Sequence, residues 1–154
     1  MANHDDIADK LCALYKLFID FSHIKEADIS QPPHEQDTLD IQKCKTGGIS
    51  DDAIALLKKL PWPRNAINHE FHLIRKSQAV MYSDNVNIEP SRHPSHPEDD
   101  VTDMPDRFLP AHIITLSFGE YDEGFSIILD ADDGRSNAAY HPTGHKTDHS
   151  RHRS

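Results

Sequence analysis

The sequence predicts an α+β fold in which two N-terminal helices pack on an antiparallel sheet of about three to five strands. Three observations lead to this fold class. Apolar residues recur at helical spacing within the first 21 residues, residues 50–60 carry a helix start and stop, and residues 112–129 contain two β-branched runs joined by a turn. The low hydrophobic content, 36%, indicates that part of the chain lies outside the core.

The first helix is predicted from Asp5 onwards, because apolar residues recur there at steps of three and four. Asn3 or Asp5 is a suitable N-cap, and the early acidic residues suit the positive end of the helix. We expect the apolar stripe to be core. It consists of Ile7, Leu11, Leu14, Tyr15, Phe18 and Phe21.

The second helix is predicted to start after Ser50, a preferred N-cap residue. Ile49 and Ile54 stand at the N′ and N4 positions, where a hydrophobic staple packs. Pro61 ends the helix, because proline cannot continue it. Its buried stripe is predicted to be Ala53, Leu56, Leu57 and Leu60.

A β-hairpin is predicted from residues 112–118 and 125–129, two apolar runs that flank a turn rich in glycine and acidic residues. Each run has one clearly apolar side and one mixed side, which is typical of a sheet that helices cover on one face. Asp130 to Gly134 then predicts a second reversal, so that residues 136–140 return as an edge strand.

Residues 71–74 and 79–82 are short apolar pieces, which predict either a second hairpin or parts of one bent strand. Residues 83–106 hold four of the ten prolines and several acidic residues, and they predict a long exposed acidic loop. Residues 141–154 form a polar, His-rich segment without an apolar anchor. We therefore expect one domain over residues 1–140, followed by a disordered tail.

Charge and cysteine content limit the classes of partner and compartment. The formal net charge of −10 is a poor match for nucleic acid or an anionic membrane, both of which attract positive patches. Only two cysteines are present, so a disulfide framework is not expected, and a reduced cytoplasmic protein fits better. No run approaches membrane-spanning length, and the N-terminus lacks the pattern of a signal peptide.

Histidines and aspartates supply the candidate metal ligands. His69 and His72 are spaced one residue closer than in the zinc-protease HExxH motif, and on a strand they would face opposite ways. The aspartates of residues 130–134 resemble part of a calcium loop, but a turn explains them better. In the tail, we expect histidines to bind transition metals only adventitiously, because a disordered segment offers no fixed ligand geometry. These histidines are His141, His145, His149 and His152.

Catalytic and cofactor-binding motifs are absent from the sequence. It contains no Gly-x-Ser-x-Gly elbow and no phosphate-binding glycine loop, and neither cysteine lies in an evident electropositive setting. We therefore expect no cofactor and no enzymatic activity.

Several segments together resemble a group of small uncharacterised proteins of filamentous fungi. They are the helix with Tyr15-Lys-Leu-Phe-Ile, the Pro32-Pro33-His34 stretch, the segment from Gly48 to Trp62, and Leu109 to Leu116 before an acidic hairpin. More distantly, the element order and the Leu-Leu-x-x-Leu-Pro helix end are similar to the SUKH superfamily, which includes bacterial toxin-immunity proteins and fungal regulators of cell-wall synthesis. The SUKH resemblance implies a protein-binding module without catalytic residues.

The leading hypothesis is a non-catalytic, cytoplasmic protein-interaction module. Its candidate contact residues are Trp62, for which a place in the core is an equal alternative, and Asp99, Asp100 and Asp103 of the acidic loop. The acidic surface favours a basic partner. The alternative is a metal-binding protein or metal-dependent enzyme that uses histidines, and a small-ligand pocket between helices and sheet is a third possibility.

Overall fold

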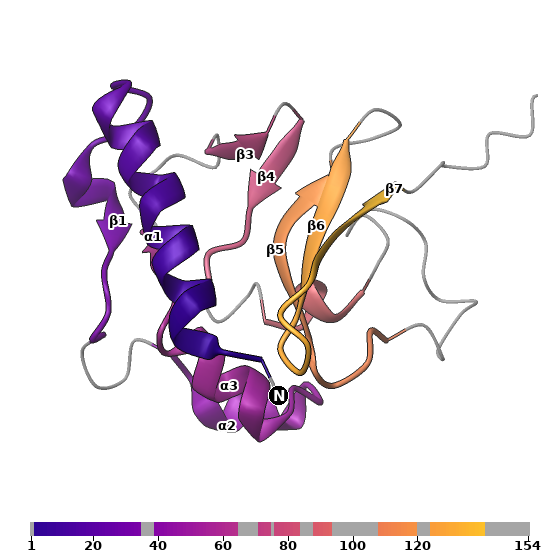
Figure 1. Cartoon of the computed structure of the whole chain (residues 1–154). Helices are drawn as coiled ribbons and strands as arrows, with labels where there is room; N and C mark the ends of the chain where they lie inside the picture. The colour runs from indigo at the N-terminus through magenta and orange to yellow at the C-terminus, as the bar shows by residue number, and fades with distance from the viewer. Residues whose placement is uncertain are drawn as a thin grey trace, which may run out of the picture.

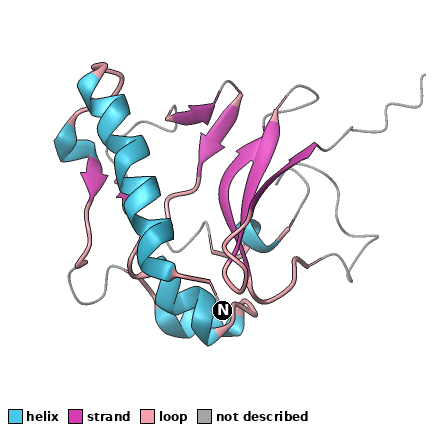
Figure 2. Cartoon of the chain, viewed as in Figure 1, coloured by secondary structure: helices cyan, strands magenta, loops and turns pink. Residues whose placement is uncertain are grey.

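A computed structural model describes residues 2–34, 39–64, 71–74, 76–83, 88–93, 108–119 and 124–140. The α-helices lie to one side of the strands of the larger sheet, as Figures 1 and 2 show. The elements in chain order are α1 (His4–Asp20), η1 (Glu26–Asp28), β1 (Ile29–Ser30), α2 (Ile41–Thr46), α3 (Asp51–Leu57), β2 (Trp62–Pro63), β3 (His72–Ile74), β4 (Ser77–Ala79), η3 (Pro90–Arg92), β5 (Ile113–Gly119), β6 (Phe125–Asp130) and β7 (Ser136–Tyr140).

The described strands form two antiparallel sheets. The larger has the order β3-β4-β5-β6-β7, and the smaller pairs β1 with β2. The predicted α+β fold with an antiparallel sheet is thus confirmed, as are the β5–β6 hairpin and the return of residues 136–140 as an edge strand. Of the two alternatives for residues 71–82, the hairpin is correct, because β3 pairs antiparallel with β4.

Of the two predicted N-caps of the first helix, Asn3 is the one observed, because its Oδ1 accepts hydrogen bonds from the amides of Asp5 and Asp6. The Tyr15 side chain is buried in a cluster with Phe71 of the segment before β3 and residues of β3 and β4. α1 therefore packs along one face of the larger sheet (Figure 1).

The prediction that the whole apolar stripe of α1 is core is wrong in part. Leu14 is 38% exposed and Phe21 is 71% exposed, and Leu17 beside them is 52% exposed. Phe21 is the C-cap residue, so it lies past the last helical turn, and the stripe is wider than the surface with which it packs. Three large apolar side chains consequently remain on the outer side of α1.

Helix α3 agrees closely with its sequence signals. The Ser50 Oγ accepts a hydrogen bond from the Ala53 amide at 3.2 Å, as expected of an N-cap residue. All four residues of the predicted stripe are buried, and so are Ile49 and Ile54.

The short helix α2 was not predicted. It is capped by the Asp40 carboxylate, which accepts from the Lys43 amide at 2.9 Å.

The predicted exposed loop of residues 83–106 is partly buried in the described portion. Ile88, Ser91 and Arg92 are at most 2% exposed. The Arg92 guanidinium donates to the carbonyls of Ile113 and Leu109, and the Thr115 hydroxyl donates to the Ser91 carbonyl at 2.7 Å. These bonds attach η3 to β5, so the polar composition of the segment did not mean that it was exposed. Residues 84–87 and 94–107 lie outside the described residues, as does the predicted tail 141–154.

Candidate functional site

Trp62 was a candidate contact residue with a place in the core as an equal alternative, and of the two the structure supports the core. Its side chain is 2% exposed, and its ring packs between His34, at a centroid distance of 4.3 Å, and Tyr82, at 6.1 Å. The strand pairing of β2 with β1 covers it, a contact made by residues 32 positions away in the sequence. Trp62 is therefore a core residue and not a partner contact.

Most other residues singled out in the sequence lie outside the described part of the chain. Asp99, Asp100 and Asp103 are in this group, and so are His69 and the tail histidines. His72 is described and lies half-buried in β3. The candidate site must therefore be built from other residues.

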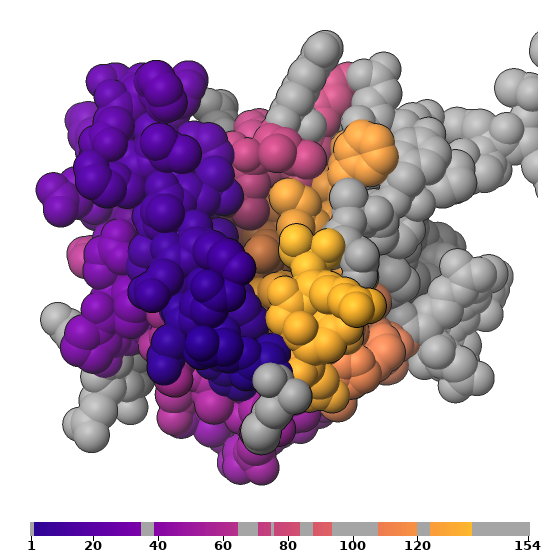
Figure 3. Space-filling view, in the orientation of Figure 1, coloured from indigo at the N-terminus to yellow at the C-terminus, as the bar shows by residue number. Residues whose placement is uncertain are grey.

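A groove of about 350 Å³ separates α1 from the larger sheet. In Figure 3 it lies where the indigo atoms of α1 meet the yellow and orange atoms of the β6–β7 region. Apolar side chains dominate the described lining. They are Ile7, Leu11 and Leu14 of α1, Leu73 and Ile74 of β3, Leu116 of β5, and Ile127 and Leu129 of β6.

The groove is continuous with exposed apolar surface on α1. Leu14 and Ile74 line the groove and are also 38% and 44% exposed, respectively. Leu17 and Phe21 follow Leu14 at steps of three and four residues, which places the three side chains on one side of the helix. We call Leu14, Leu17 and Phe21 the α1 stripe.

Two ion pairs flank this surface. The Lys10 Nζ lies 2.6 Å from the Asp6 Oδ2, and the Lys16 Nζ lies 2.9 Å from the Asp20 Oδ2. All four side chains are more than half exposed, so each pair contributes only a few tenths of a kcal/mol, about 0.3–0.5, to helix stability. Lys10 also lines the groove, where it is the only charged residue among the described lining residues.

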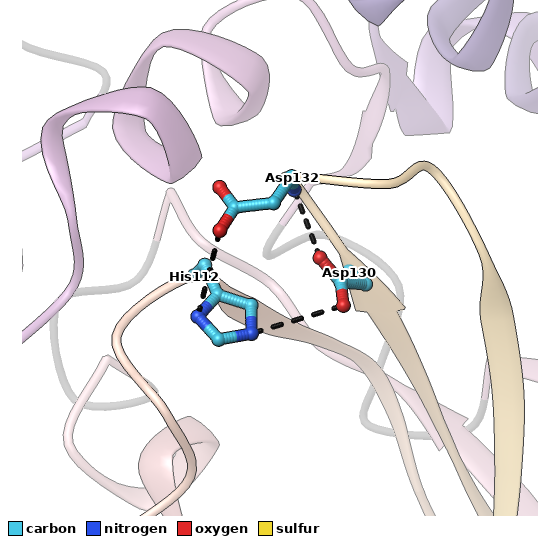
Figure 4. Close-up of side chains that lie close together, drawn as sticks. All are labelled: His112, Asp130 and Asp132. Carbon is cyan, nitrogen blue, oxygen red and sulfur yellow. Dashed lines mark hydrogen bonds and ion pairs between the residues drawn. The ribbon is translucent and has the colours of Figure 1, made fainter. Parts of the chain in front are cut away.

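A second site consists of His112, Asp130 and Asp132 (Figure 4). These residues surround one point at the open end of the β5–β6 hairpin, where β5 begins and β6 ends. The His112 Nε2 lies 3.7 Å from the Asp130 Oδ2, and its Nδ1 lies 3.8 Å from the Asp132 Oδ2. The three side chains each offer one ligand atom, and these atoms lie within 4.8 Å of one another. We call these residues the His112 cluster.

The turn geometry positions the carboxylates of the His112 cluster. The Asp130 Oδ1 accepts from the amides of Asp132 and Asp133 at 2.8 and 3.2 Å, which leaves the Oδ2 directed toward the imidazole. The N–O distances exceed those of direct hydrogen bonds, about 2.7–3.2 Å. They approach the separation of two ligands that share a metal ion through bonds of about 2 Å. A nitrogen and two carboxylate oxygens are a donor set that divalent transition metals accept.

Asp130 and Asp132 were predicted to be turn residues, and the contribution of His112 was not predicted. The hairpin register supplies the signal that could have found it. Ile113 pairs with Asp130, so the residue before Ile113 must lie beside the turn that follows Asp130. A predicted hairpin with this register would have brought His112 and the two aspartates together.

Comparisons with known proteins found no matching family model, curated protein or solved structure. In the described part of the chain, no helix has both the length and the apolar composition that a bilayer span requires.

Proposed function

We propose that this protein is a non-catalytic protein-interaction module that contacts its partner through the α1 stripe. The observation that carries the proposal is the exposure of Leu14, Leu17 and Phe21 on one side of a helix whose other side is anchored in the core. Adjacent exposed apolar side chains of this size mark interaction surfaces more often than isolated ones do. A SUKH-like relationship, which the element order and the helix end led us to expect, would imply the same protein-binding function.

The proposed partner is a protein segment with apolar side chains and a basic surface. Asp20 is exposed on α1 three residues after Leu17, and the whole chain carries a formal charge of −10. Charge of this sign steers a basic partner toward the surface, while the apolar residues supply the contact area. Two free cysteines, Cys12 and Cys44, suit a reducing compartment, so we propose a cytoplasmic location.

Chemical crosslinking in cells followed by mass spectrometry tests this proposal with three proteins. The first is the wild type, the second carries Leu17→Ser and Phe21→Ser, and the third carries Ile41→Ser. Ile41 is a matched control because it is 39% exposed on α2, away from the stripe. We expect one basic protein to be captured by the wild type and the control but lost from the double variant, with capture weakened at high salt. Equal capture by all three proteins would refute the proposal.

The second candidate function is metal binding by the His112 cluster, in place of the histidines first considered. The approach of one imidazole and two carboxylates is the observation in its favour. A metal ion binds only one nitrogen of the imidazole, whereas Asp130 faces the Nε2 and Asp132 faces the Nδ1. One of the two carboxylates must therefore move to share a metal ion with the other.

Elemental analysis and Mn²⁺ titration of protein purified without a metal-affinity tag test the second candidate. Asp130→Asn keeps an oxygen for the turn amides but removes the anionic ligand, and Asp133→Asn is the control from the same turn. If the cluster binds metal, Asp130→Asn and His112→Ala each weaken Mn²⁺ binding by tenfold or more, while Asp133→Asn does not. Equal binding by all variants would assign the metal to other histidines.

A further inference from the structure

We propose that the groove between α1 and the larger sheet binds a long-chain carboxylate, with the hydrocarbon chain against the sheet and the carboxylate at Lys10. This small-molecule site adjoins the proposed partner surface and shares Leu14 with it. Leu17 and Phe21 of the partner surface do not line the groove, which is formed by residues 7–14 of α1 and by the larger sheet.

The groove is apolar surface that the described residues do not fill. Two clusters of buried residues lie in the domain, and Leu11 and Leu116 pack against both while remaining only partly buried. Ile127 faces α1 from β6 and is also only partly buried, although it lies on the covered face of the sheet. Because burial of each methylene is favourable, a ligand chain that occupies this space gains affinity from side chains already in position.

The size of the groove indicates that it holds one hydrocarbon chain. Its volume of about 350 Å³ lies at the lower end of the range for ligand pockets, about 300–1,000 Å³. The described lining contributes no aromatic ring and few polar groups, so a flexible aliphatic chain suits it better than a planar or highly polar molecule.

Charge complementarity selects a carboxylate as the head group. Lys10 is the charged residue among the described lining residues, and Ser136 contributes a hydroxyl to the same lining. The Lys10 ammonium now pairs with Asp6 in an exposed position, where such a pair is weak, so a ligand carboxylate can replace or share it. A cationic amphiphile would instead meet the ammonium at the mouth of the groove.

Titration with decanoate, dodecanoate and tetradecanoate below their micelle concentrations tests the site by calorimetry. We expect the Kd to fall about threefold to fourfold per added methylene until the groove is full. Dodecyltrimethylammonium should bind at least tenfold more weakly than dodecanoate. Affinity that depends on chain length but not on the sign of the head group would refute the assignment of a carboxylate.

The two ion pairs of α1 offer a matched pair of variants. Lys10→Met and Lys16→Met each remove one lysine from an exposed pair four residues apart, but only Lys10 lines the groove. We expect Lys10→Met to weaken dodecanoate binding about threefold to fivefold and Lys16→Met to leave it unchanged. Equal effects would mean that net charge, and not this site, controls binding.

Groove-filling variants test the location of the chain. Ile127→Trp places an indole in the groove from the sheet, and Leu14→Trp does so from a partly exposed helix position, where a change of fold is not expected. Both should reduce dodecanoate affinity at least tenfold with circular dichroism unchanged. Unchanged binding in Leu14→Trp would overturn the inference. Retention of dodecanoate binding in the Leu17→Ser, Phe21→Ser variant, together with loss of the protein partner, would separate the two proposals.

Discussion

The imidazole of His34 lies against the indole of Trp62, with ring centroids 4.3 Å apart and an interplanar angle of 34°. Both ring nitrogens of His34 form hydrogen bonds. The Nε2 lies 2.7 Å from the Leu60 carbonyl oxygen, and the Nδ1 lies 3.0 Å from the Ser30 Oγ. Since a carbonyl only accepts, the Nε2 carries the proton, and the Nδ1 accepts from the Ser30 hydroxyl. The neutral imidazole thus connects β1 to the segment that follows α3.

This arrangement predicts a loss of stability in mild acid. Burial lowers the pKa of His34, although its bond to the Leu60 carbonyl acts in the opposite direction. The folded protein therefore binds fewer protons at His34 than the unfolded chain, whose histidine pKa is about 6.5. The contribution of neutral His34 to the free energy of unfolding is therefore fully present above the unfolded-state pKa. It is lost as the pH falls through the lower pKa of the folded state. Urea unfolding at pH 7.5 and pH 5 measures the loss.

The variant His34→Asn isolates the contribution of this residue. We expect it to be less stable than wild type at pH 7.5 and to lose less stability than wild type between pH 7.5 and pH 5. His23→Asn, at an exposed position, is the control and should retain the wild-type pH dependence. If His34→Asn keeps the full pH dependence, another histidine is responsible.

Ser77 and Ser117 form a buried polar link between β4 and β5. The Oγ atoms are 2.5 Å apart, and the Ser77 hydroxyl donates to the Phe125 carbonyl at 2.6 Å. Ser117 must then donate to Ser77, while it accepts from the Ile127 amide. Both side chains are fully buried. Ser77→Ala should lower the free energy of unfolding by about 1–3 kcal/mol, because it leaves a buried hydroxyl without its acceptor. Ser136→Ala, at an exposed position, is the control. In urea unfolding it should change the free energy of unfolding by less than about 0.5 kcal/mol.

Gly119 stands where two backbone segments approach closely at the end of β5. A Cβ at this position would lie 2.7 Å from the Gly124 carbonyl carbon and 2.9 Å from the Phe125 nitrogen. Because backbone atoms cannot rotate away, we expect Gly119→Ala to destabilise the protein by about 1–3 kcal/mol, as in overpacked cores.

Gly48 provides the comparison for Gly119. Its φ is +80°, but a Cβ there meets nothing within 4 Å. Gly48→Ala should therefore carry only the cost of the left-handed backbone, about 1–2 kcal/mol. Thermal unfolding of both variants measures the difference. A Gly119→Ala protein as stable as wild type would show that the backbone at Gly119 and Gly124 can separate without a loss in the free energy of unfolding.

The two cysteines should differ in reactivity. Burial, followed by the charge of Asp40, raises the pKa of Cys44 to about 11, and its side chain is fully buried. Cys12 is partly exposed, and its pKa is also raised by burial and by Asp9. We expect a disulfide reagent to modify Cys12 slowly in the native protein and Cys44 only after unfolding. Cys12→Ser should abolish the native reaction, and rapid modification of two thiols would contradict this assignment.

Signals within a few neighbouring residues predicted much of the local structure. Asn3 and Ser50 cap α1 and α3 as predicted, because a cap requires only the amides two or three residues ahead. The β5–β6 hairpin and the β6–β7 turn follow from apolar runs and from the aspartates and Gly134 between them. For these elements the interactions that select the conformation lie within the segment itself.

Burial and the candidate sites were decided by contacts between distant segments. The pattern that buries Tyr15 also includes Phe21, and only the extent of the sheet determines that one is covered and the other exposed. Trp62 is buried because β1 pairs with β2, and Arg92 is buried because β5 supplies carbonyl acceptors. The groove beside α1 likewise arises from how far a helix and a sheet approach each other. The sequence by itself determined where α1, α3, the turns and the β5–β6 hairpin form, because these depend on local hydrogen bonds and periodicity. Only the tertiary structure decided which apolar residues remain open to a ligand or partner, because exposure depends on what the rest of the chain covers.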